Sequence, residues 1–226
     1  ICAKMTYMKQ PTRRFAYVAI ALISFVANTY SMGIIEAFYK FPVEIAFQLP
    51  SSQKTAILTS YFSNQPAMAT SRYNTPVQLM MVDTLGNYMQ YQTSAASTTE
   101  LKTITATNGK TYIFHNAITC GPVCDSHITI FDENWYYVPI QQIAPALIKL
   151  QVSDFFDVTT ATSEGIDIAD LLTSIRPVFY ELNFAIQHND LLVTLHLNAL
   201  PETTRQQLQP YYHQTIRLSW NGERFE

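Results

Sequence analysis

The chain has 226 residues, of which 14 are lysine or arginine and 17 are aspartate or glutamate, so its formal net charge at pH 7 is −3. Aromatic residues make up 13% of the chain and only six residues are glycine, which favours packed antiparallel sheet over a disordered or repetitive chain. The length suits one domain with a real core or two small modules. The excess of acidic residues argues against a nucleic-acid-binding protein, because an acidic surface repels the phosphate backbone.

The N-terminal segment has the pattern of an export signal. Lys9, Arg13 and Arg14 precede an apolar run of about 13 residues, 15–27, and polar residues close the run. That length is typical of a signal peptide, whereas a membrane-spanning helix needs roughly 20 apolar residues. Cleavage after Ser31 satisfies the small-residue rule. We therefore expect a signal peptide at residues 1–31, a single α+β domain at residues 32–226, and a periplasmic or extracellular location.

An uncleaved anchor that continues to Ile35 is the alternative. It would have to bury Asn28 and Ser31, and polar residues cost insertion energy in a bilayer. A membrane is therefore expected as a partner only if this segment stays uncleaved. Removal of residues 1–31 leaves 10 of the 14 basic side chains against all 17 acidic ones, a net charge near −7. We do not expect nucleic acid as a partner. We expect a protein of the cell envelope or a glycan.

The first elements after the signal are a helix and a series of hairpins. Pro50 and Ser51 mark a helix start, because apolar residues recur at helical spacing after them. The strongest turn signal is Asn108-Gly109, since both residues tolerate positive φ. Strands paired as three hairpins are expected at residues 77–82 and 88–92, 100–106 and 111–118, and 128–131 and 135–138.

The C-terminal half continues with shorter elements. Helices are expected at residues 143–150 and 167–175, a fourth hairpin at 179–187 and 191–198, a helix at 201–212 interrupted by Pro210, and a last strand at 215–220. The predicted fold class is α+β: a mostly antiparallel, twisted sheet built from hairpins, with two to four helices packed on one face.

The middle of the chain carries a family resemblance. The run from Tyr91 to Lys102 is followed by a hairpin and then by Cys120-Gly121-Pro122-Val123-Cys124-Asp125-Ser126. This pattern resembles an exported family of unknown function found in the phylum Bacteroidota, family 3256 of the domains of unknown function. The resemblance covers residues 41–225 and is most specific around the two cysteines. It implies export and a single domain type, and it implies no catalytic residue.

Cys120 and Cys124 are expected to form a disulfide. Two positions four apart on an extended chain lie too far from each other to bond, but Gly121-Pro122 supplies a chain reversal. In an oxidising compartment the two thiols most simply pair, and closing so short a loop stabilises the fold by roughly 2 kcal/mol. A thiol-redox role and a zinc site completed by His115 and His127 are the alternatives. No metal and no cofactor is assigned.

Two other groups of residues are candidates for function. A face that binds sugar or peptide could be formed by Trp135, Tyr136, Tyr137, Phe155 and Phe156, although strand alternation must bury some of them. A paired-carboxylate hydrolase site could lie among Asp154, Asp157, Glu164, Asp167 and Asp170, although helix-capping acids explain the pattern more simply.

No familiar catalytic motif supports an enzyme. The chain has no Gly-x-Ser-x-Gly elbow, no His-Glu-x-x-His pair and no glycine-rich phosphate loop. We therefore predict no catalytic residue and a non-catalytic binding or interaction module of the cell envelope. A hydrolase with an unrecognised carboxylate site and a thiol-redox accessory protein are the alternatives.

Overall fold

The computed structural model describes residues 31–42 and 49–226, which all belong to one compact unit, Ser31–Glu226. The predicted signal peptide, apart from Ser31, lies outside the described residues. Across the described ranges, no helix has the length and apolar character needed to span a membrane. The signal peptide and the location of the protein therefore stay predictions.

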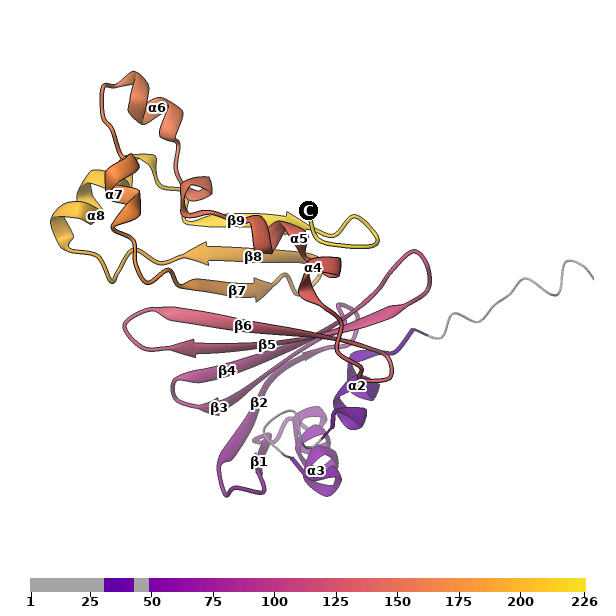
Figure 1. Ribbon diagram of the computed structural model, residues 1–226. Coiled ribbons are helices and arrows are strands. Elements are labelled where there is room, and N and C mark those ends of the chain that lie inside the picture. The colour runs from indigo at the N-terminus through magenta and orange to yellow at the C-terminus, as the bar shows by residue number, and fades with distance from the viewer. Residues whose placement is uncertain (1–30, 43–48) are drawn as a thin grey trace, which may run out of the picture. The chain divides into compact units, whose positions relative to one another are not determined.

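Six antiparallel strands form a large sheet in which each strand lies beside its neighbours in the sequence (Figure 1). They are β1 (Met68–Thr70), β2 (Pro76–Asp83), β3 (Tyr88–Ser94), β4 (Ser97–Thr105), β5 (Thr111–Cys120) and β6 (Cys124–Asp132). The predicted hairpins β2–β3 and β4–β5 are confirmed, and Gly109 adopts the positive φ that the β4–β5 turn requires. The strand expected at 135–138 makes only an isolated bridge, between Phe131 and Tyr137.

A second, smaller sheet follows in the chain. Its order is β7 (Tyr180–Phe184), β8 (Asp190–Leu195) and β9 (Thr215–Ser219), all antiparallel, and it contains the predicted fourth hairpin and last strand. The α+β class and the hairpin-built antiparallel strands are confirmed. The strands are divided between two sheets.

The helices of the described residues are short. They are α2 (Ile34–Lys40), α3 (Ser51–Phe62), α4 (Ile140–Ile143), α5 (Pro145–Lys149), α6 (Val158–Ser163), α7 (Ala169–Thr173) and α8 (Glu202–Leu208), with 3₁₀ turns η1 (Val152–Phe155) and η2 (Gln209–Tyr211). These seven α-helices exceed the two to four expected. One reason is Pro145, which forces Ala144 out of the helical region and divides the helix predicted at 143–150 into α4 and α5.

Strand alternation gives the large sheet two buried faces. One face packs against α2 and α3 through odd-numbered residues such as Val77, Met89 and Leu101. The other face joins the main core, with the small sheet and the C-terminal helices, through even-numbered residues such as Phe114 and Ile130. Because both faces are covered, β4 has a run of six buried residues, 99–104.

Polar side chains attach the small sheet to the large one. The edge strand β7 has no strand partner on this side among the described residues, and side chains from three strands bond its backbone instead. Asn116 Nδ2 donates to Leu182 O (2.7 Å), Phe184 N donates to Glu100 Oε2 (3.1 Å), and Leu182 N donates to Ser126 Oγ (2.9 Å). We call Glu100, Lys102, Asn116 and Ser126 the polar row. It supplies the hydrogen bonds that a neighbouring strand would otherwise give.

Two members of the polar row are charged residues in the core. The Lys102 side chain is fully buried, and its Nζ donates to three carbonyl oxygens, those of Gly86 (2.7 Å), Ala185 (3.0 Å) and Ile186 (2.9 Å). Burial lowers the pKa of Lys102 to about 8, although nearby acids oppose the shift. Burial has the opposite effect on Glu100, whose pKa it raises. The hydrogen bonds that Asn116 and Tyr88 donate to the carboxyl group lower this pKa and offset part of the shift. The pattern of residues along β4, β5 and β6 does not predict this row.

Candidate functional site

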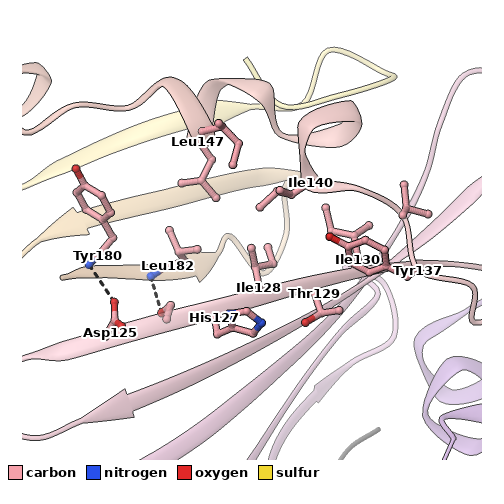
Figure 2. Close-up of a pocket in the computed structure, with 13 residues that line it drawn as sticks. Asp125, His127, Ile128, Thr129, Ile130, Tyr137, Ile140, Leu147, Tyr180 and Leu182 are labelled. Atoms are coloured by element: carbon pink, nitrogen blue, oxygen red, sulfur yellow. Dashed lines mark hydrogen bonds between the residues drawn. The ribbon is translucent and has the colours of Figure 1, made fainter. Parts of the chain in front are cut away.

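A groove lies beside β6, the last strand of the large sheet. Its volume is about 380 Å³, within the range of small ligand sites. Figure 2 shows β6 along one wall, Ile140 and Leu147 on the opposite side, and Tyr180 and Tyr137 at the two ends. The walls are mainly apolar, and the lining includes Ile148, an isoleucine of α5 whose side chain is half-exposed.

The outer edge of β6 faces this groove. Two backbone hydrogen bonds to the returning segment, Val138 N to Ile130 O (2.9 Å) and Asp132 N to Tyr136 O (2.9 Å), show which residues of β6 point away from β5. By strand alternation Ile128 also directs its N–H and C=O outward. In the described part of the chain no strand pairs with β6 on this side beyond the single Phe131–Tyr137 bridge. The groove therefore offers backbone donors and acceptors between apolar walls.

The small sheet borders the groove without pairing with β6. Tyr180 N donates to Asp125 Oδ1 (3.3 Å) and Leu182 N donates to Ser126 Oγ (2.9 Å), as the dashed lines in Figure 2 show. Beyond these bonds β7 crosses over the face of the large sheet towards Glu100 on β4. The separation of the two strands leaves the middle of the β6 edge uncovered.

Cys120 and Cys124 face each other at the end of the β5–β6 hairpin and are joined by a disulfide bond. The predicted chain reversal occurs at residues 121–123, where Gly121 N donates to Val123 O (2.9 Å). Two side chains of the small-sheet segment lie beside this pair. The ligand atoms of Cys124, Glu181 and His196 all lie within 4.8 Å of one another, and His196 Nε2 is 2.7 Å from Glu181 Oε2.

His115 and His127, the two histidines proposed from sequence as zinc ligands, do not lie beside the two cysteines. His115 and His127 are odd-numbered residues of β5 and β6, whereas both cysteines are even-numbered, so alternation sends the two kinds of side chain to opposite faces. His115 stacks on Phe41 (5.4 Å between ring centroids), and burial lowers its pKa to about 4. The histidine beside the cysteines is His196, which the sequence analysis did not single out.

The five aromatic residues proposed as one binding face lie in different environments. Phe155 and Phe156 are buried in the main core. Trp135 adopts a positive φ of 67° and packs edge-on against Phe41 (4.6 Å), next to the α2 and α3 side of the sheet. Tyr136 and Tyr137 are exposed, and only Tyr137 lines the groove. Phe155 and Phe156 lie at the end of a 3₁₀ turn and not on a strand, so both side chains are buried instead of alternating between the core and solvent.

The acidic residues of the 154–170 region make local hydrogen bonds. Asp157 caps α6 and Asp154 completes a capping box at η1. Asp167 accepts a hydrogen bond from the backbone N–H of Ala169, two residues on, and Glu164 accepts from the hydroxyl of Tyr211. Asp167 and Asp170 also line a separate hollow of about 550 Å³ beside α7 and α8. The hydrolase alternative therefore stays a hypothesis without an assigned carboxylate pair.

The protein is thus an α+β domain with two antiparallel sheets and a disulfide at the end of one hairpin. The chain belongs to the family described as protein of unknown function (DUF3256), which matches residues 26–225. The family predicted from the cysteine region is thereby confirmed. A solved structure of similar fold is a domain of an uncharacterized protein from Porphyromonas gingivalis W83, with a TM-score of 0.67 and 14% sequence identity over 86% of this chain and 98% of that one. No curated protein matches the chain.

Proposed function

We propose that this domain is an exported, non-catalytic binding module of the cell envelope and that the groove beside β6 holds a short extended segment of a partner protein. The observation that carries the proposal is the uncovered edge of β6 between apolar walls. An extended peptide can add to such an edge as a further strand. Its backbone then supplies affinity, and its alternate side chains enter pockets.

The dimensions and chemistry of the groove support a peptide. At about 380 Å³ the groove suits a few residues of extended chain. Ile128 offers the N–H and C=O that a ladder needs, while Ile140, Leu147 and Leu182 offer apolar contact to one side of the ligand. A glycan is the competing ligand, because Tyr137 and Tyr180 could stack on a sugar ring.

Export enters the proposal through the sequence. The basic residues and the apolar run before residue 31 have the pattern of a signal peptide, and the disulfide between Cys120 and Cys124 is compatible with an oxidising compartment. The acidic balance of residues 32–226 favours a partner segment that is neutral or basic.

Selection of random, unstructured peptides displayed on phage tests the proposal. Selected peptides should bind the purified chain, and N-methylation of alternate backbone amides should abolish their binding, because methylation removes the ladder donors. Ile148→Glu, which places a charge at the exposed rim of the groove, should weaken binding at least about tenfold. Leu85→Glu is the matched control, since Leu85 is exposed on the β2–β3 turn and does not line the groove.

Three results would contradict the proposal. The first is peptide affinity that survives N-methylation, because the backbone edge would then play no part. The second is equal binding by the Ile148→Glu and Leu85→Glu variants, because the ligand would then lie outside the groove. The third is selective binding to a glycan array, blocked by Ile148→Glu, with no selected peptide; that result would replace the peptide with a sugar.

A further inference from the structure

The cysteine pair lies beside two side chains of types that commonly serve as metal ligands, a carboxylate and an imidazole. Glu181 on β7 and His196, directly after β8, come from the same hairpin and are joined by a 2.7 Å contact. Their side chains are 23% and 15% exposed, so the cluster is accessible to small solutes and still largely desolvated. The ligand atoms of Cys124, Glu181 and His196 lie within 4.8 Å of one another, and the sulfur of Cys120 is bonded to that of Cys124.

We propose that the reduced Cys120–Cys124 pair, with His196 and Glu181, forms a binding site for a zinc ion. Two thiolates, one imidazole and one carboxylate are four donors of the kinds that tetrahedral zinc takes. In a zinc site of ideal geometry the donor atoms are roughly 3.3–3.8 Å apart, as follows from zinc–ligand bonds of about 2.0–2.3 Å. Zinc binding therefore requires the side chains of the present cluster, whose ligand atoms lie within 4.8 Å of one another, to move closer together.

The oxidation state of the cysteines decides whether the site exists. Reduction breaks the S–S bond and takes up two electrons and two protons, which a dithiol donor supplies as it becomes a disulfide itself. Zinc then bonds to both sulfurs, and the two thiol protons leave to solvent. In the oxidised chain neither sulfur is a thiolate, so only Glu181 and His196 remain, and two ligands do not form a structural zinc site.

The site is independent of the peptide groove. Its ligands Cys120, Cys124, Glu181 and His196 do not line the groove, although Asp125, Tyr180 and Leu182, next to them in the sequence, do. Loss of metal binding would therefore leave peptide binding unchanged. Loss of peptide binding in the Ile148→Glu variant would likewise leave metal binding unchanged.

Cobalt titration of the full chain tests the inference. Cys2→Ser serves as the parent, so that only Cys120 and Cys124 supply thiols. A phosphine, oxidised to its oxide with oxygen from water, reduces the protein and is removed without air. One equivalent of Co²⁺ should then produce a thiolate-to-cobalt charge-transfer band and the visible bands of tetrahedral cobalt, and Zn²⁺ should displace it.

Variants separate the four-ligand site from a plain dithiol. His196→Ala and the isosteric Glu181→Gln should each lower Zn²⁺ affinity at least about tenfold. His188→Ala should leave it unchanged, because His188 is exposed at the other end of the β7–β8 hairpin. Circular dichroism of each reduced protein establishes that it is folded. Absence of the charge-transfer band from the folded, reduced parent would overturn the inference, as would equal affinity in the oxidised chain or undiminished affinity in both ligand variants.

Discussion

Lys102→Met is the sharpest test of how the two sheets are held together. Methionine keeps most of the length and apolar contact of the lysine stem, but it removes the ammonium that bonds the carbonyls of Gly86, Ala185 and Ile186. The last two acceptors lie 83 and 84 residues from Lys102 in the sequence, so these bonds join the large sheet to the segment after β7.

The expected loss follows from the full burial of the Lys102 side chain and the partial burial of the residues whose carbonyls it bonds. A hydrogen bond to a charged group contributes about 1.5–3 kcal/mol, but desolvation of the ammonium offsets part of three such bonds. Removal of one partner from a buried charged cluster costs about 3–5 kcal/mol. We expect the lower end, about 3 kcal/mol, because Ala185 and Ile186 are only half-buried and water can reach their carbonyls in the variant.

Urea unfolding at neutral pH, followed by circular dichroism, measures the free energy of unfolding. Lys110→Met is the matched control, because Lys110 is exposed beside the β4–β5 turn and should change stability by less than about 0.5 kcal/mol. Hydrogen exchange should show that Lys102→Met loses protection first in β7. If Lys102→Met is as stable as Lys110→Met, the lysine does not hold the two sheets together.

Three further predictions concern single positions. Gly86→Ala should destabilise the domain by at least about 1 kcal/mol, because a Cβ there would lie 2.0 Å from Ile186 O, whereas Gly121→Ala meets no atom within 4 Å and should be tolerated; thermal unfolding of both variants decides this. The free energy of unfolding of the wild type, compared with that of the Glu100→Gln variant, should fall as pH rises above 4.5. The reason is that the raised pKa of Glu100 makes the folded state bind a proton more tightly than the unfolded state. If the wild type instead gains stability over the variant as pH rises, Glu100 is ionised in the folded state. Phe155→Ala should lose about 3–5 kcal/mol in urea unfolding and Tyr136→Ala less than about 0.5, and similar losses would contradict their assigned burial.

The local elements of this fold are predictable from sequence, and the junction between the sheets is not. The β4–β5 hairpin follows from Asn108-Gly109, because the short turn between Ala106 and Lys110 needs a residue of positive φ and Gly109 supplies it locally. Glu100 and Lys102, on the same strand, are charged residues on either side of Leu101, and strand alternation places them on the face opposite Leu101, as if that face were exposed to solvent. Their bonding partners, Phe184 and Ala185, are more than 80 residues away, so no local pattern indicates that β7 covers this face.

The same division applies to the candidate sites. The pairing of Cys120 with Cys124 was found because both cysteines and the turn between them lie within five residues. The side chains beside the pair were not found, because Glu181 and His196 approach only after the small sheet has packed on the large one. The groove was missed for a similar reason: its walls come from β6, α5 and β7. Of its residues, Tyr137 and His127 were singled out from sequence, but for two different kinds of site.

The polar row connects these observations. By bonding β7 across the face of the large sheet instead of along its edge, Asn116, Glu100 and Ser126 determine where the small sheet lies. That placement leaves the middle of the β6 edge uncovered and brings Glu181 and His196 to Cys124. If β7 had continued the ladder of β6, the groove would be filled by a strand of the domain itself. These buried polar side chains, whose desolvation costs free energy unless they are hydrogen-bonded, are thus the feature that creates both candidate sites.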